Sequence, residues 1–156
     1  MFKNFIISLL VVLSTLSANN SNTTAQIHWE ENFHKGMVHA QEQNKPVLFV
    51  YSRHTCKYCV ILEKTTFKDK KVIEALNRDF ISIVSYTDEN DYTPGELRSP
   101  GTPILWFLYP DTSMMFQPIQ GAVDAENFLS ALSLVKEEFD KVEKAKKSKE
   151  TKKAKK

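Results

Sequence analysis

A continuous apolar run, Val47–Tyr51, constrains the fold of this chain more than any other stretch. A strand with one solvent-facing side alternates apolar and polar residues, whereas an uninterrupted apolar run is typical of a strand buried on both faces of its sheet. Asn44-Lys45-Pro46 stands directly before the run, and proline disfavours helical backbone in the residue ahead of it. The run therefore predicts an α/β fold in which residues 47–51 form a central strand.

The remaining patterns predict helices and strands within one domain, roughly residues 27–142. The helical stretches carry apolar residues on one face, and the stretch at 80–86 alternates and is rich in Ile and Val. In chain order we expect a helix (29–44), the central strand (47–51), two helices (56–66 and 70–78), a strand (80–86), a loop (87–101), two strands joined by a turn (104–109 and 114–120) and a final helix capped by Asp124. The sequence contains no internal repeat, and a domain of this size can bury a real core.

Residues 1–25 have the layout of a secretory signal peptide. One positive charge, Lys3, precedes the apolar stretch Phe5–Leu13, and small and polar residues follow. The apolar stretch is short for a membrane span, which needs about 20 apolar residues. We therefore expect an exported protein, with an uncleaved membrane anchor as the alternative.

The two cysteines, Cys56 and Cys59, form one C-x-x-C motif shortly after the apolar run. Small exported proteins that need covalent staples usually carry several disulfides, and a bridge across this motif would close too short a loop to stabilise the fold much. A four-cysteine zinc site is excluded because the sequence holds no second pair. A redox pair is the favoured interpretation. The alternatives are an inert disulfide and a copper site that combines the two thiols with His54 or Met114-Met115.

Several ordered segments make this sequence resemble the thioredoxin superfamily. "NKPVLFVYS" and the C-x-x-C after it resemble the family's central strand and active-site motif, and "YTDEN" resembles the end of its next strand. "GTPILWF" is similar to the cis-proline segment, and "IQGAVDAENFLSAL" to the family's glycine and last helix. The resemblance covers about Trp29–Val135. It implies a thioredoxin fold, in which a central mixed β-sheet is flanked by helices and a cis-proline loop faces the start of the C-x-x-C helix.

The resemblance also implies different roles for the two cysteines. Cys56 would be the exposed nucleophile, because the free amides and the positive end of a helix dipole stabilise a thiolate at the first helical positions. Cys59, one turn further on, would be the resolving thiol that attacks the mixed disulfide and releases the product. We expect no metal and no cofactor other than the Cys56–Cys59 disulfide itself.

Five further residues are expected around the cysteines. The resemblance implies that the turn at Pro103 lies against the cysteines and that Thr102, the residue before it, offers its backbone to the substrate chain. Pro103, Lys57 and Tyr58 are the other expected substrate-binding residues. An ordinary trans proline at the start of a strand is the alternative interpretation of Pro103. His54 would add positive charge that favours the Cys56 thiolate, and a plain surface role is the alternative.

Two departures from the family pattern concern proton transfer and substrate type. Counting back from Cys56, the buried acidic residue of cytosolic thioredoxins falls on Val50, and the lysine near it falls on about Val84. Water or an unidentified group must therefore accept the proton in this chain. Tyr58 together with Thr102-Pro103 is more similar to the periplasmic disulfide isomerases and reductases of bacteria than to their strong oxidase.

The sequence thus predicts a periplasmic thiol:disulfide oxidoreductase that reduces or isomerises protein disulfides. The expected partners are substrate proteins with disulfides, including oxidised C-x-x-C-H sites of apocytochrome c, and a membrane thiol reductant that supplies electrons. The direction of electron flow comes from the resemblance alone. A copper metallochaperone that uses the same two thiols and a disulfide-donating oxidase are the alternatives.

The formal net charge of +2 hides two regions of opposite sign. Residues 141–156 contain nine lysines and two glutamates, so the domain before them is acidic. An acidic domain does not favour binding to nucleic acid. We expect the lysine-rich tail, residues 143–156, to extend the last helix and fray in solvent, with weak contact to an anionic membrane surface as the alternative.

Overall fold

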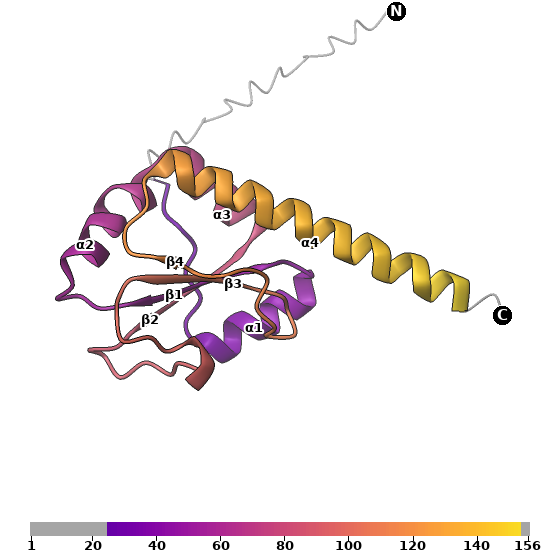
Figure 1. The fold of residues 1–156 in the computed structure, drawn as a ribbon, viewed down its shortest axis with the longest axis horizontal. Coiled ribbons are helices and arrows are strands. Elements are labelled where there is room, and N and C mark those ends of the chain that lie inside the picture. Colours follow the sequence, from indigo (N-terminus) through magenta and orange to yellow (C-terminus); the bar gives the residue numbers. More distant parts are fainter. Residues whose placement is uncertain (1–24, 154–156) are drawn as a thin grey trace, which may run out of the picture.

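A mixed sheet of four strands in the order β2-β1-β3-β4 forms the centre of the computed structural model, which describes residues 25–153 (Figure 1). β1 (Val47–Ser52) lies parallel to β2 (Ile81–Tyr86) and antiparallel to β3 (Ile104–Leu108), and β3 pairs with β4 (Ile119–Gln120). The apolar run is therefore the central strand, as predicted. The predicted signal peptide, residues 1–25, lies outside the described residues except for Ala25.

Helices account for most of the remaining chain. They are α1 (Phe33–Gln43), α2 (Lys57–Lys64), α3 (Lys70–Asp79) and α4 (Ala125–Lys153), with the short 3-10 helices η1 (Thr66–Lys68) and η2 (Gly95–Leu97). Polar residues define where they begin: the Asp69 side chain accepts hydrogen bonds from the Lys71 and Val72 amides, and so caps α3.

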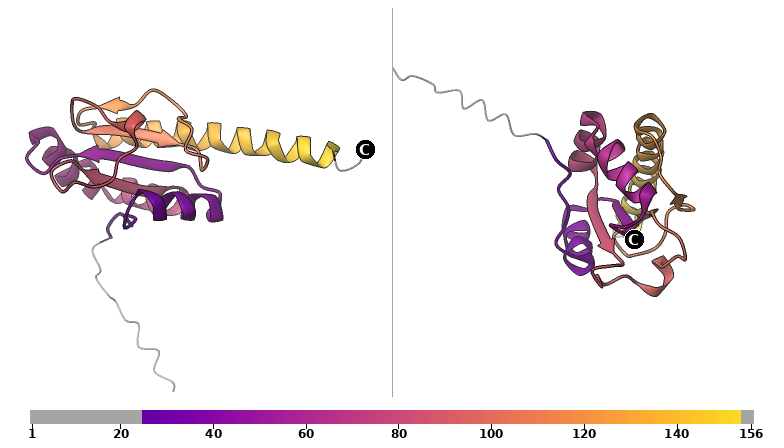
Figure 2. Two further views of the ribbon diagram at one scale, coloured as in Figure 1. Left: turned by 90° about the horizontal axis from the view of Figure 1, so that it is seen from below. Right: turned by 90° about the vertical axis from the view of Figure 1, so that its left-hand side faces the viewer.

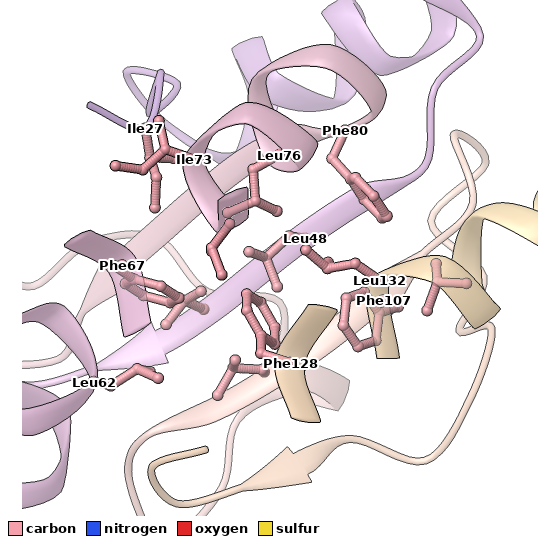
Figure 3. Close-up of a cluster of buried hydrophobic side chains, with 14 residues drawn as sticks. Ile27, Leu48, Leu62, Phe67, Ile73, Leu76, Phe80, Phe107, Phe128 and Leu132 are labelled. Atoms are coloured by element: carbon pink, nitrogen blue, oxygen red, sulfur yellow. The ribbon is translucent and has the colours of Figure 1, made fainter. Parts of the chain in front are cut away.

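The side chains of β1 alternate between two hydrophobic clusters, one on each face of the sheet. Leu48 and Val50 belong to the cluster under α2, α3 and α4, whereas Val47 and Phe49 belong to the cluster under α1. Figure 1 shows α1 on one face of the sheet and α3 and α4 on the other, and Figure 3 shows the larger cluster. Burying each large apolar side chain contributes about 1.5–3 kcal/mol. The run is uninterrupted because both of its faces are covered.

α1 begins later than the apolar pattern predicts. Trp29 forms an isolated parallel bridge with Ser82, and the Glu30 amide donates to the Ser82 carbonyl at 2.8 Å. The helix starts only after Asn32, whose side chain caps it by accepting a hydrogen bond from the Lys35 amide. The predicted start at residue 29 was wrong because this segment pairs with the edge of β2.

The second strand of the predicted hairpin is shorter than expected. Instead of a strand over 114–120, the structure has an isolated bridge between Met114 and Leu108 and the two-residue strand β4. Pro118 lies inside this segment and cannot donate a hydrogen bond to a ladder, so regular pairing is interrupted there.

α4 continues well past the predicted domain boundary at residue 142 and projects beyond the sheet (Figure 2). Glu143 accepts a hydrogen bond from Asn44 at 3.0 Å, and the Lys146 ammonium lies 5.6 Å from the centre of the Tyr109 ring. Ala, Lys and Glu favour helical backbone, and the Lys146–Glu143 pair spans one turn, so the tail continues the helix. Within residues 25–153, no helix is long and apolar enough to cross a membrane.

Candidate active site

The candidate active site lies where β1 ends and α2 begins. β1 carries the chain to the buried Ser52, and residues 53–55 then turn it into α2. Cys56 is the N-cap of this helix: its backbone is extended, and its Sγ accepts a hydrogen bond from the Cys59 amide at 3.3 Å. The sulfur therefore occupies the position at which a helix N-terminus stabilises negative charge.

The surroundings of Cys56 favour its thiolate. Its side chain is partly exposed, and its thiol donates to the Thr102 carbonyl at 3.2 Å. Burial raises the pKa of Cys56, but hydrogen bonds with the side chains of Cys59 and Thr102 and with the amides of Cys59 and Tyr58 outweigh that effect and lower the pKa below its ordinary value. Cys56 is thus an accessible thiol poised to ionise.

The surroundings of Cys59 disfavour its thiolate. Its side chain is only 1% exposed, and burial raises its pKa. The hydrogen bond to Cys56 raises the pKa further, while contacts with Thr102 and Ser52 lower it to a smaller extent. Because only a thiolate attacks a disulfide, Cys59 must lose its proton before it can react.

The Thr102–Pro103 segment faces the cysteines from the β3 side of the sheet. Its peptide bond is cis, and the Pro103 carbonyl accepts a hydrogen bond from the Gly121 amide at 2.8 Å. Gly121 has a φ of 83°, which favours glycine over residues with a side chain. This loop places the Thr102 carbonyl beside Cys56, 46 residues earlier in the chain.

Lys57 and Tyr58 point outward from the first turn of α2. Lys57 is exposed, and Tyr58 is 58% exposed despite its large aromatic ring. An exposed aromatic ring beside a partly exposed thiol offers apolar contact to a protein chain that approaches the sulfur. This position fits the substrate contact that the sequence predicts for both residues.

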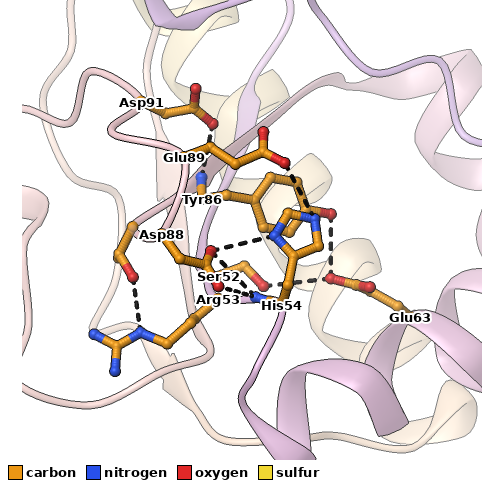
Figure 4. A network of polar contacts seen from close by, with 9 residues as sticks. Ser52, Arg53, His54, Glu63, Tyr86, Asp88, Glu89 and Asp91 are labelled. Carbon is orange, nitrogen blue, oxygen red and sulfur yellow. Dashed lines mark hydrogen bonds and ion pairs between the residues drawn. The ribbon is translucent and has the colours of Figure 1, made fainter.

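His54 lies near the cysteines in sequence, but its ring is engaged elsewhere. It stacks on Tyr86 with ring centres 3.9 Å apart, and Nδ1 and Nε2 lie 3.2 and 3.5 Å from the carboxylates of Asp88 and Glu89 (Figure 4). The His54 amide also donates to Asp88 at 3.0 Å. These contacts join the loop before α2 to the loop after β2, and the two acidic groups offset the positive charge that was expected to act on Cys56.

Behind Cys59 lies a partly buried carboxylate, Glu63, that sequence reasoning did not identify. Ser52 Oγ donates to Glu63 Oε1 at 3.3 Å, and the Tyr86 hydroxyl donates to the same oxygen at 3.2 Å (Figure 4). The signal in the sequence was the spacing, because Glu63 stands four residues after Cys59 and so lies on the same face of α2. At the family's usual acidic position, Val50 is 2% exposed and packs in the core.

The structure tests the copper alternative through the placement of His, Cys, Asp and Glu side chains in the part of the chain that it describes. Among residues 25–153, no group of three or more His, Cys, Asp or Glu side chains is placed to hold a metal ion. His54, the histidine suggested for such a site, is engaged by Asp88 and Glu89.

Comparison with known protein families identifies a match over most of the domain. Residues 33–136 match the sequence model of a family described as "Thioredoxin-like domain". The match begins at α1, includes the C-x-x-C motif and the Thr102–Pro103 segment, and ends within α4.

Two relatives illustrate how far the similarity extends. Anterior gradient protein 3 of Mus musculus is 24% identical over 128 residues, which cover 72% of this chain and 75% of the mouse protein. The thiol:disulfide interchange protein DsbD of Pseudomonas fluorescens is 31% identical over 131 residues. That match covers 81% of this chain but only 22% of DsbD, so this chain corresponds to less than a quarter of that relative.

Solved structures share the fold. A thioredoxin from Thermus thermophilus superimposes with a TM-score of 0.60 at 23% identity, covering 70% of this chain and 87% of that one. The oxidised C-terminal domain of Neisseria meningitidis DsbD gives a TM-score of 0.51 at 21% identity, covering 64% of this chain and 88% of that one. The predicted thioredoxin fold, with its mixed sheet flanked by helices, is confirmed.

Proposed function

Because the chain belongs to the thioredoxin-like family, we propose that it is an exported thiol:disulfide oxidoreductase whose redox pair is Cys56 and Cys59. One observation carries this proposal: a partly exposed thiol with a lowered pKa and a buried thiol with a raised pKa lie one helical turn apart, beside the Thr102 carbonyl. The same two side chains thus provide an attacking group and a resolving group.

The reaction follows from the order in which the two thiols ionise. The Cys56 thiolate attacks one sulfur of a substrate disulfide, forms a mixed disulfide and releases the other substrate sulfur as a thiolate. Cys59 then loses its proton and attacks Cys56 Sγ, which releases the second substrate sulfur and leaves a Cys56–Cys59 disulfide. Two electrons pass from the protein to the substrate, and two protons must reach the released thiolates.

The substrate chain would lie against the first turn of α2 and the Thr102–Pro103 loop. The backbone of Thr102 would pair with it beside the reacting sulfur, and Tyr58 and Lys57 would contact its side chains. These roles rest on the resemblance and on the position of the four residues around Cys56.

We assign the reducing direction, in the periplasm. The predicted signal peptide supports export, and the similarity to DsbD, whose name describes thiol:disulfide interchange, supports the reaction class. The reducing direction rests on the family resemblance alone. Substrates would be proteins with disulfides, with oxidised C-x-x-C-H sites of apocytochrome c as one class, and a membrane thiol protein would reduce the Cys56–Cys59 disulfide after each turnover.

The reduction potential of the Cys56–Cys59 pair tests the direction. Thioredoxin-like pairs near about −270 mV and strongly oxidising pairs near about −120 mV differ by roughly 7 kcal/mol for two electrons, a gap that experimental error does not blur. We expect a value below about −220 mV, measured on metal-free mature protein against a dithiothreitol or glutathione series. A value above about −150 mV would contradict the reducing direction and favour the oxidase alternative.

Metal analysis of anaerobically purified protein tests the reaction class. Metal-free protein that reduces insulin, with Cys56→Ser inactive, is the expected result. Stoichiometric copper that is lost on substitution of either cysteine, in a protein that does not reduce insulin, would replace the oxidoreductase with a metallochaperone.

The lysine-rich end of α4 is a candidate for weak contact with an anionic membrane surface. Beyond Lys146, its side chains are exposed throughout the described residues, and clustered lysines are attracted to acidic lipid headgroups at about 1 kcal/mol each. Deletion of residues 147–156 spares the contacts of Glu143 and Lys146 with the domain. The deletion should weaken sedimentation with anionic vesicles at low salt, and unchanged sedimentation would rule the contact out.

A further inference from the structure

A chain of polar groups leads from Cys59 into the protein on the side away from the substrate. Ser52 Oγ donates to Glu63 Oε1 at 3.3 Å, and its hydroxyl lies near enough to the Cys59 thiol to lower the pKa of that thiol. Ser52 is only 1% exposed, so bulk water does not replace these partners. A hydroxyl group can accept a proton from one neighbour while it donates its own to another, so this arrangement can pass a proton from sulfur to carboxylate.

The secondary structure holds the three groups together. Cys59 and Glu63 are four residues apart in α2 and share one face of the helix, and Ser52 ends β1 directly beneath that face. Ser52 pairs with Tyr86 in the parallel β1–β2 ladder, which brings the Tyr86 hydroxyl to within 3.2 Å of Glu63 (Figure 4). Burial raises the pKa of the Tyr86 hydroxyl and the nearby Glu63 charge raises it further, so this group remains a hydrogen-bond donor.

Glu63 has its own route to solvent. Together with Tyr86 and Trp29 it lines a surface cavity of about 280 Å³, and Lys64 and Lys68 lie at the same cavity. The cavity lies on the β2 side of β1, whereas the Thr102–Pro103 loop lies on the β3 side. A proton on Glu63 can therefore leave by a path that a bound substrate does not block.

We propose that Glu63, acting through Ser52 Oγ, accepts the proton that Cys59 loses in the resolving step and releases it to solvent through this cavity. The proposal rests on the function proposed above. In the step, the Cys59 S–H bond breaks, its proton moves to Ser52 Oγ, and the Ser52 hydroxyl proton moves to the Glu63 carboxylate. The Cys59 thiolate forms a bond with Cys56 Sγ, and the Cys56–substrate S–S bond breaks to release a substrate thiolate.

Glu63 would fill the role of proton acceptor, for which the sequence offered no residue. The usual acidic position of the family is occupied here by the buried Val50, which cannot accept a proton. The pKa of Cys59 is raised by burial, so its spontaneous ionisation at neutral pH is unfavourable and a nearby acceptor would speed the step. Glu63 acts on the reacting sulfur only through Ser52, so it is a positioning and proton-accepting residue rather than a group in contact with the substrate.

The experiment follows the two chemical steps separately in the full mature chain. Reduced protein is mixed rapidly with excess dithiobis(nitrobenzoate), an aryl disulfide that releases one coloured thiolate when Cys56 attacks and a second when Cys59 resolves the mixed disulfide. The rate of the first release rises with reagent concentration because that step is bimolecular. The rate of the second does not, because Cys59 attacks within the same molecule. The variants are Glu63→Gln and Ser52→Ala, and Glu74→Gln is the matched control because it removes one carboxylate from an exposed position on α3.

We expect Glu63→Gln to leave the first release within about twofold of the original rate and to slow the second about tenfold or more at neutral pH. Ser52→Ala should slow the second release in the same way, and Glu74→Gln should change neither. Simple electrostatics predicts the opposite sign, because removing a negative charge near Cys59 stabilises its thiolate and would speed resolution. An unchanged circular dichroism spectrum and thermal unfolding midpoint show that each variant is folded.

The pH profile and chemical rescue provide the second readout. The deficit of Glu63→Gln should shrink as pH rises, because hydroxide then removes the Cys59 proton directly. The other titratable groups around this path are Cys56, Tyr86, Lys64 and Lys68, with His54 and Glu89 beyond Tyr86, and all of them remain in the variant. Formate should restore the second release in Glu63→Ala without changing the first, since it can enter the space that the carboxylate leaves.

The outcomes separate this proposal from the function on which it rests. A second release in Glu63→Gln that equals or exceeds the original rate overturns the role of Glu63 and leaves the oxidoreductase function standing. A wild-type protein that releases one thiolate but never the second has no resolving step, and then the proposed function fails together with the role of Glu63.

Discussion

The two sides of α2 place the same chemical group, a thiol, in opposite surroundings. On the β3 side, Cys56 is partly exposed and faces the Thr102 carbonyl. On the β2 side, Cys59 is buried and lies above Ser52 and Glu63. One helical turn separates a group that reacts with protein substrates from a group that reacts only inside the protein.

The difference comes from the neighbours of each sulfur rather than from the cysteines themselves. Cys56 occupies the N-cap, where free amides donate to it, whereas Cys59 lies inside the helix and has lost its contact with water. The pKa of one thiol is lowered and that of the other is raised, so the two ionise in sequence rather than together. A redox pair built on a helix needs this asymmetry, because the resolving thiol must wait until a substrate is attached.

Exchanging each cysteine for serine tests the asymmetry most strongly. Cys56→Ser should lose insulin reduction down to the level of the buffer, because the buried Cys59 cannot reach a protein disulfide. Cys59→Ser should still attack but should accumulate mixed disulfides through Cys56. Non-reducing electrophoresis with mass spectrometry of the trapped species measures both. Trapping through Cys59 in the Cys56→Ser variant, with none through Cys56, would reverse the two roles.

The pH dependence of alkylation compares the pKa values of Cys56 and Cys59 directly. Its expected effect is smaller than the loss of activity above. Only the thiolate reacts with iodoacetamide, so each rate rises with pH through the pKa of the thiol concerned. An ordinary cysteine has its midpoint at about pH 8.5. In Cys59→Ser, the alkylation rate of Cys56 should reach its midpoint at a lower pH. In Cys56→Ser, the rise for Cys59 should have its midpoint above the ordinary value, because burial remains when Cys56 is removed. Coincident midpoints would show that the two environments do not differ.

His54→Ala should have the smallest effect. The His54 ring contacts Tyr86, Asp88 and Glu89, and ion pairs at exposed positions contribute little to stability. We expect the alkylation midpoint of Cys56 to move by less than about half a pH unit, the equivalent of about 0.7 kcal/mol. Lys57→Ala, which removes another nearby positive charge, is the matched comparison. A rise of a full unit in His54→Ala alone would show that His54 does stabilise the Cys56 thiolate.

Much of the fold followed from local patterns in the sequence. The run at Val47–Tyr51 identified the central strand, and the spacing of apolar residues identified the helices, because burial on one or two faces imposes a period that can be counted. Errors occurred where a distant partner decided the outcome. Trp29 pairs with Ser82 instead of entering α1, and the segment around Pro118 forms only a short strand against β3.

The candidate site also combines features that local sequence predicts with features that depend on distant residues. The motif and its place after a buried strand were enough to predict two cysteines at the start of a helix, because a strand end and a helix N-terminus are local features. The contact between Cys56 and Thr102 was predicted only through the family resemblance, since 46 residues separate them. Glu63 was not identified, because its role depends on Ser52 and Tyr86, which lie 11 and 23 residues away in sequence.

The order of residues alone therefore accounts for most of the helices and strands, the acidic domain with its lysine-rich end, and the presence of a thiol pair on a helix. The packing of α2 against β1, β2 and the Thr102–Pro103 loop accounts for which thiol is exposed, which is buried and which groups can exchange protons with them. The physical reason is that pKa values and proton paths depend on burial and on contacts of a few ångströms, and these arise only when strands that are far apart in the sequence become neighbours in the sheet.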